Sequence, residues 1–246
     1  MAVQKYGTKK VGTLDELTHY QGKVANEKNA YLVRLKGGVS RDRILKDAAF
    51  ARTRENMSDF ATAGSLSRDI QRLLSPILKG TKSAQAFGRF TGLLRLLMNA
   101  DATNVRGQRV VDWVSLSNRI VGFNFSKERF DSIVDYDATS AAVAVTGDLF
   151  VESPGTTHHE VQAQFVGIDT ANDIVFVSEA YESGKVANGS AINLTSATWT
   201  HGLQTGDPIL VVMGVKFFQE VNGTFYPFNN KSYRAASVVN LAGVPV

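Results

Sequence analysis

The chain has 246 residues, 43% of them hydrophobic and 20% charged, so it is long enough to bury one sizeable core or two smaller ones and has the composition of a globular protein. It contains no cysteine, which excludes disulfides, zinc–thiolate sites and cysteine nucleophiles together. No apolar run approaches the roughly 20 residues that span a bilayer, and the first residues lack the apolar stretch of a secretory signal. We therefore expect no membrane span, and either a cytoplasmic protein or part of a released assembly.

The formal net charge of +4 conceals an asymmetry along the chain. Residues 1–130 contain 23 Lys and Arg against 11 Asp and Glu, a balance of +12, whereas residues 131–246 contain 4 against 12, a balance of −8. A charge division this large bears on the partners that the protein attracts, and it does not indicate a fold. Three interpretations stay open: the halves attract each other within one molecule, they attract each other between copies, or the basic half binds nucleic acid or another polyanion.

The chain is predicted to begin with short strands and to continue into helices. Residues 31–36 alternate as a strand does, and Gly37-Gly38 ends it. Ser40 is a good helix N-cap, because its hydroxyl accepts from a backbone N–H of the first turn, and Asp42 places an anion where the helix dipole favours it. We expect a helix to begin directly after Ser40.

A helical period continues to about residue 99. Gly64 interrupts it, so a second helix is expected to begin with Ser65 as its cap. The apolar stripe of this helix covers residues 66–78, and Pro76 predicts a kink or an end nearby. A third helix has its apolar stripe over residues 84–97.

From about residue 120 the hydrophobic period changes to two, which is typical of strands. Residues 208–213 and 215–221 are typical of buried strands, and Asn222-Gly223 is a strong signal for a type I′ hairpin turn. The sequence therefore predicts an α+β fold. A basic, mainly helical domain with short N-terminal strands covers residues 1–120. An acidic antiparallel β-sandwich, Ig-like or jelly-roll-like, covers residues 121–246.

The chain lacks the motifs of common catalytic and cofactor sites: no Walker loop, G-x-G-x-x-G, G-x-S-x-G or H-E-x-x-H. His158 and His159 begin a predicted strand, where neighbours point to opposite faces and do not share a metal. Asp131, Asp135 and Asp137 lack the glycine and terminal glutamate of a calcium loop, so we interpret them as a solvated acidic turn. We expect no enzyme, no cofactor and no metal site.

The basic half supplies the candidate contact residues, because arginines are dense after residue 40 and two of them lie at i and i+4 on one helix face. Phosphate binding uses such a row, but acidic residues are interleaved with it, and pairing within or between molecules explains the mixture equally well. The candidate contacts for assembly or for a polyanion are Arg41, Arg43, Arg52, Arg54, Arg68 and Arg72, together with Asp131, Asp135 and Asp137.

Two segments carry a resemblance to a known family. The first combines residues 36–39 (KGGV) with residues 50–60 (FARTRENMSDF), and the second is residues 214–227 (GVKFFQEVNGTFYP). Together they resemble a family of uncharacterised proteins from Bacteroidota with a helical front and a β-rich back. The resemblance implies a bacterial origin, or a virus of such bacteria, and it carries over no activity and no catalytic residues.

The leading hypothesis is a non-enzymatic structural protein that assembles with itself as a filament, tube, ring or virion-like lattice. The basic helical face of one copy would meet the acidic β face of the next, and such a heterologous contact either closes or propagates. The alternative is a binding module, in which the β domain holds a glycan or peptide or the basic half holds nucleic acid. Its stacking candidates are Tyr181, Trp199, Tyr226 and Tyr233, although such aromatics more often fill a sandwich core.

Overall fold

The computed structural model describes residues 2–3, 11–24, 27–113, 117–127, 133–137, 142–146, 155–172, 174–190, 193–194, 202–230 and 234–243. The chain divides into two compact units, Met1–Arg54 and Glu55–Val246, called here the N-terminal unit and the larger unit. The division falls in the first turn of helix α2 (Ala51–Leu73). The change in composition near residue 120, where a domain boundary is predicted, therefore lies inside the larger unit.

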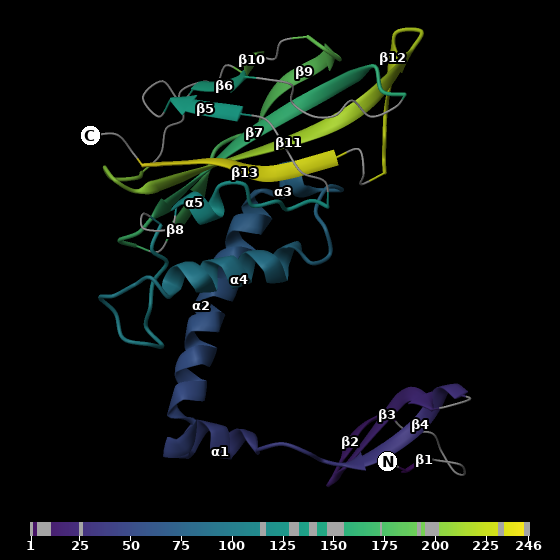
Figure 1. Cartoon of the computed structure of the whole chain (residues 1–246), viewed down its shortest axis with the longest axis vertical. Coiled ribbons are helices and arrows are strands. Elements are labelled where there is room, and N and C mark those ends of the chain that lie inside the picture. Colours follow the sequence, from purple (N-terminus) through teal and green to yellow (C-terminus); the bar gives the residue numbers. More distant parts are fainter. Residues whose placement is uncertain are drawn as a thin grey trace. The chain divides into compact units, whose positions relative to one another are not determined.

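The N-terminal unit carries a four-stranded antiparallel sheet with the strand order β1-β4-β3-β2 (Figure 1). Ala30 and Leu32 are the buried side chains among the described residues of this unit. Leu32 packs over Gly22, where an added Cβ would lie 2.9 Å from Leu32 Cδ1. The strand predicted over residues 31–36 is confirmed by the end of β4. The strands are β1 (Ala2–Val3), β2 (Gly12–Leu14), β3 (Leu17–Val24) and β4 (Glu27–Leu35).

Helix α1 (Arg41–Lys46) begins where Ser40 predicts it. The backbone N–H of Arg43 donates to Ser40 Oγ at 3.3 Å, so the cap is confirmed. A 3-10 turn, η1 (Ala48–Phe50), follows and leads into α2. Asp47 caps this turn, since its Oδ1 accepts from the N–H of Ala49 at 2.9 Å.

Helix α2 continues through Gly64, so the predicted break at this residue is wrong. A glycine inside a helix costs about 1 kcal/mol relative to alanine, and burial of α2 residues on both sides of Gly64, such as Ala63 and Ile70, offsets that cost. The helix ends at Leu73, and the short α3 (Ser75–Leu78) holds Pro76 in its first turn. Proline is tolerated there because the backbone N–H groups of a first turn have no partner within the helix. The prediction of a helix end near Pro76 is confirmed.

Two further helices complete the helical layer, α4 (Ala86–Met98) and α5 (Ser117–Ile120). The apolar stripe of α4 is buried at Phe90, Leu94 and Leu97, as its spacing predicts, whereas Phe87 is exposed. Phe90 packs against the ring of Phe123 and that of Phe125, with centroids 4.9 and 5.2 Å apart, which ties α4 to the segment after α5. No described helix combines the length and apolar character that crossing a membrane requires.

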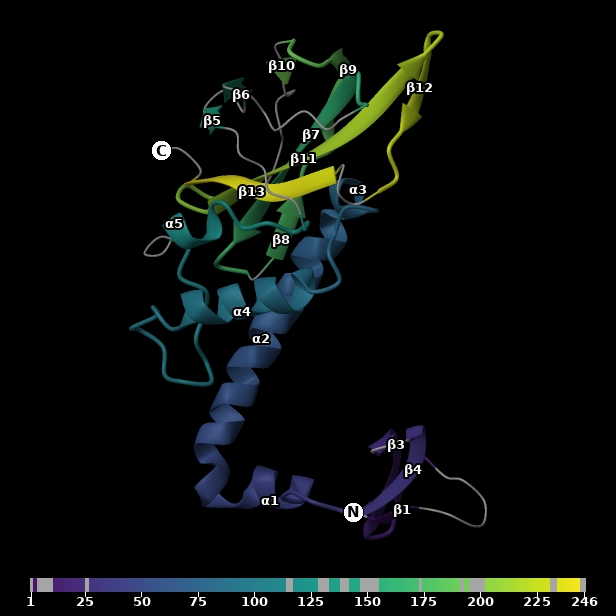
Figure 2. The same ribbon diagram turned by 45° about the vertical axis from the view of Figure 1, so that its right-hand side comes forward.

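A curled antiparallel sheet of six strands forms the centre of the larger unit (Figure 1; Figure 2). Its two long strands pair from Ile209 with Gly167 to Phe218 with His158. Each long strand shares its other edge between two shorter partners, β12 and β13 on β11, and β8 and β9 on β7. The strands are β7 (His158–Asp169), β8 (Ile174–Val177), β9 (Tyr181–Ala187), β11 (Pro208–Val221), β12 (Thr224–Pro227) and β13 (Arg234–Gly243).

Both faces of this central sheet are buried. Leu210 and Val212 of β11 face the helices and share one core with Ile77 of α3. Gly214 lies in the same row, and an added Cβ there would come 2.6 Å from Ile77 Cγ2, so the missing side chain lets α3 approach the sheet. The intervening β11 residues, Ile209 among them, point to the opposite face and form a second core.

A small sheet with the order β10-β6-β5 lies beyond the central sheet on the side away from the helices (Figure 1). It consists of β5 (Ile133–Asp137), β6 (Ala142–Thr146) and β10 (Asn193–Leu194). Strand β5 lies beside β13 and β10 beside β9, so the small sheet reaches both sides of the central one. The prediction of helices followed by an antiparallel β-rich region is confirmed, while the Ig-like or jelly-roll-like sandwich type stays a prediction.

A buried ion pair joins α4 to α2, and hydrogen bonds beside it hold the loop after α4. Arg95 Nη2 lies 3.1 Å from Asp59 Oδ2, and the side chains of both residues are almost fully buried. The other carboxylate oxygen of Asp59 accepts from the N–H of Gly107 at 2.9 Å, and Ser58 Oγ donates to the carbonyl of Gly107 at 2.7 Å. Two hydrogen bonds to Gly107 therefore hold the loop against α2, beside the ion pair that joins α2 to α4.

Candidate functional site

Two of the four predicted arginines in residues 41–54 hold a corner of the N-terminal unit. Arg43 Nε donates to Asp47 Oδ2 at 3.2 Å, and Arg54 Nη1 donates to the carbonyls of Ile44 and Asp47 at 2.8 Å each. The N–H of Ala49 and the Arg43 guanidinium hold the pKa of Asp47 below its usual value. These contacts give Arg43 and Arg54 a structural role between α1 and α2.

The remaining predicted contact residues are spread over other elements. Arg41 and Arg52 are exposed in the N-terminal unit, and Arg68 and Arg72 are exposed on α2 in the larger unit. Arg72 Nη2 lies 3.5 Å from Asp69 Oδ1, an exposed pair of the kind that contributes little energy. Asp131 lies outside the described residues. Asp135 and Asp137 belong to strand β5, in place of the predicted acidic turn.

An exposed apolar row crosses the N-terminal sheet. Leu14 pairs with Leu17, and Leu17 pairs with Leu35, so the three residues stand side by side on one face of β2, β3 and β4. They are 53%, 40% and 74% exposed. Three adjacent leucines exposed to water on one sheet face form a surface suited to contact with another apolar surface.

A basic pocket opens in the larger unit, where the central sheet extends past α3. It has a volume of about 520 Å³. The pocket is lined by the cations Lys79, Lys185, Lys216 and Arg234 and by the carboxylate Glu160. Three of these cations belong to residues 131–246, which hold 4 Lys and Arg in all. The acidic half thus gathers most of its positive charge in one place.

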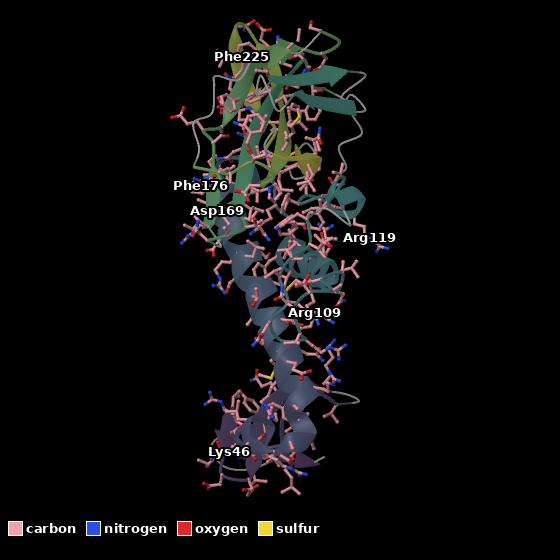
Figure 3. All side chains as sticks on the ribbon, turned by 90° about the vertical axis from the view of Figure 1, so that its left-hand side faces the viewer. Lys46, Arg109, Arg119, Asp169, Phe176 and Phe225 are labelled. Carbon is pink, nitrogen blue, oxygen red and sulfur yellow. The ribbon has the colours of Figure 1, made fainter. Side chains whose placement is uncertain are left out.

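Contacts with neighbouring residues hold two of the pocket cations in position. Arg234 Nε donates to the carbonyl of Phe228 at 3.3 Å, and its Nη2 donates to Asn229 Oδ1 at 3.0 Å. The ammonium of Lys185 lies 5.3 Å from the ring centroid of Phe218 and 5.5 Å from that of Phe225, within the range of cation–π attraction. Figure 3 labels Phe225 at this end of the central sheet, with Asp169 at the opposite end.

Glu160 is the negative group of the basic pocket. It pairs with Lys216 across β7 and β11, and Lys216 Nζ lies 3.9 Å from Glu160 Oε1. The amide nitrogen of Gln162, on the same face of β7, donates to Glu160 at 3.4 Å. A buried carboxylate requires such partners, because burial without them favours its neutral form.

Sequence reasoning missed the basic pocket because its residues come from four separate segments. Lys79 follows α3, and the other cations lie on β9, β11 and β13. The signal available was weak: Lys216, Lys185 and Arg234 each interrupt a strand-like segment of an otherwise acidic region. Only the register of β11 with β7 and β13 brings these interruptions together.

The adjacent pair His158-His159 begins a strand, as predicted. Strand β7 begins at His158, and its neighbour His159 is buried with Nδ1 3.2 Å from Asn188 Oδ1. The ring of His158 instead packs edge-on against Phe225, and its Nε2 lies 3.6 Å from Glu220 Oε2. The described residues include no group of three or more His, Asp and Glu placed to hold a metal ion.

Comparisons with protein-family models, with curated proteins and with solved structures find no match to this chain. The resemblance to Bacteroidota proteins therefore stays a prediction. Any proposal about function depends on the two surfaces described above, the apolar row and the basic pocket.

Proposed function

We propose that this protein is a non-enzymatic structural protein that assembles with copies of itself, and that the N-terminal sheet provides one side of the contact. The observation that carries the proposal is that this sheet buries few side chains and exposes large apolar ones. Its unit buries two side chains among the described residues, whereas the apolar row Leu14, Leu17 and Leu35 is exposed. A small sheet of this kind gains stability mainly by packing against something else.

Charge favours a second copy as the occupant. Residues 1–54 contain 12 Lys and Arg against 5 Asp and Glu, a balance of +7, and residues 131–246 have a balance of −8. The basic N-terminal unit of one copy is therefore electrostatically complementary to the acidic β region of another. Such a contact uses two different surfaces, so it generates rings or filaments rather than two-fold dimers.

The test is the size of the full-length protein in solution, measured by light scattering and negative-stain microscopy at low and high salt. We expect large regular particles at low salt that shrink as salt screens the charge contact. Leu35→Glu places a charge in the apolar row and should shift assembly to at least about tenfold higher protein concentration.

Val105→Glu is the matched control, because Val105 is 67% exposed and lies in a loop of the larger unit. It adds the same charge away from the apolar row and should leave assembly unchanged. A protein that stays monomeric at both salt concentrations contradicts the proposal. Equal effects of the two variants contradict the role of the apolar row.

A further inference from the structure

The basic pocket carries more positive charge than its own residues neutralise. Lys79, Lys185, Lys216 and Arg234 bring four positive charges, and Glu160, 3.9 Å from Lys216, brings one negative charge. Among the described residues no carboxylate lies within ion-pair distance of the other three cations. Like charges gathered in a recess focus the electric field and raise the local concentration of anions.

The arrangement of these cations is already organised for an anion. The guanidinium of Arg234 is held by Phe228 and Asn229 and lies against Gly80, where any side chain would collide with it. The ammonium of Lys185 lies within reach of two aromatic rings, which attract it without neutralising it. Such preorganisation lowers the entropic cost of ordering these side chains when a ligand binds.

The size and lining of the pocket define the class of ligand. Three cations without a carboxylate partner favour a group with more than one negative charge, and a phosphate monoester carries about −1.5 to −2 at pH 7. The volume of about 520 Å³ exceeds what one inorganic anion fills and lies in the usual range of small-molecule sites. Phe218, Pro76 and Pro227 give the pocket an apolar wall for an organic part.

We propose that the basic pocket binds a small phosphorylated organic molecule, with the phosphate among Lys79, Lys185 and Arg234 and the organic part against Phe218. Glu160 accepts a hydrogen bond from a hydroxyl or amino group of that ligand and discriminates against a second anionic group beside Lys216. This binding function is independent of self-assembly, because all of these residues lie in the larger unit.

The experiment is calorimetric titration of the full-length protein at low salt with phenyl phosphate, and with phenyl sulfate as a probe of similar shape and single charge. We expect one saturable site for phenyl phosphate and clearly weaker binding of phenyl sulfate. Lys79→Gln and Lys185→Gln should each weaken phenyl phosphate about tenfold, the loss typical of one charge-assisted contact. Both lysines are exposed, so these variants keep the fold.

Arg68→Gln is the matched control, since Arg68 is an exposed cation of the larger unit that does not line the pocket. It removes the same charge and should leave the affinity within twofold of the parent. Absence of saturable binding at millimolar phenyl phosphate overturns the proposal. An equal loss in Arg68→Gln, or equal affinity for phenyl sulfate, also overturns it, because binding would then follow overall charge alone.

Discussion

The N-terminal sheet and the central sheet are both antiparallel, yet they differ in what covers them. The central sheet has helices on one face and a second core on the other, so nearly every residue of β11 from Pro208 to Phe218 is buried. The N-terminal sheet buries two described side chains and exposes the apolar row. The two sheets therefore differ in what packs against their faces as well as in the apolar content of their strands.

The difference separates stability from assembly. Substitutions in the central sheet act on the folded state of the larger unit, where side chains already have their partners. Substitutions in the apolar row act on the proposed contacts between copies of the chain. Both tryptophans, Trp113 and Trp199, belong to the larger unit, so tryptophan fluorescence follows the unfolding of that unit alone.

Removing one partner of the buried ion pair in the larger unit should lower the free energy of unfolding more than any other change described below. Arg95→Met leaves the buried carboxylate of Asp59 without its cation and should destabilise the larger unit by about 4 kcal/mol. Urea unfolding followed by tryptophan fluorescence measures the change. Arg68→Met, at an exposed position of the same helical layer, should cost less than about 0.5 kcal/mol. A small loss in Arg95→Met would mean that Asp59 finds another partner.

Threonine introduced at one position of each sheet tests whether the two sheets differ in this way. Val212→Thr keeps the shape of a fully buried side chain but adds a hydroxyl, which should cost about 1–3 kcal/mol in urea unfolding if it finds no partner. Leu17→Thr, in the apolar row, should change the free energy of unfolding of the larger unit by less than about 0.5 kcal/mol. It should instead weaken assembly. Equal destabilisation by the two variants would remove the distinction between the sheets.

A smaller effect is expected from acid. Hydrogen bonds from Asn104 and Val110 hold the pKa of Asp101 well below its usual value, and those from Asn172 lower the pKa of Asp169. For Asp207, burial raises the pKa, but the hydrogen bonds from the Gln204 N–H and from the N–H and hydroxyl of Thr170 together lower it by more.

Because these pKa values are lower in the folded state than the usual 3.8, the carboxylates stabilise the larger unit above about pH 4, and that contribution is lost as pH falls through the folded values. Urea midpoints followed by tryptophan fluorescence should therefore be level from neutral to mildly acidic pH and fall below about pH 4. Asp101→Asn should lower the urea midpoint at neutral pH and reduce the fall of that midpoint below about pH 4. If the midpoint of this variant falls below about pH 4 as steeply as that of the parent, the loss of stability in acid comes from other carboxylates.

Local chemistry was readable from the sequence where one or two residues determine the backbone. Ser40 caps α1, Pro76 opens α3, and Asn222 and Gly223 both have positive φ values, 51° and 79°, in the predicted hairpin turn. In each case the side chain, or its absence, favours one backbone conformation. The change from a helical to a strand period near residue 120 was predictable because apolar residues are spaced differently in helices and in strands.

What could not be predicted depends on contacts between distant segments. Gly64 disfavours a helix locally, but the buried face of α2 outweighs that preference. The charge division near residue 130 indicates neither the compact units nor the basic pocket, since the pocket draws Lys79 from one side of it and Arg234 from the other. Register across β7, β11 and β13 creates this site, and no single segment contains it.

The pairing of β7 with β11 also governs how the larger unit is reached during folding. The two strands are tens of residues apart in sequence, so their contact waits for the closure of a long loop, whereas α2 and α4 need only local contacts. Helices form within microseconds, and such long-range sheets form in milliseconds to seconds. During that interval the apolar run from Ile209 to Met213 is exposed and has the composition of an aggregating segment. A segment that is fully buried in the folded protein is therefore expected to promote aggregation of the newly made chain.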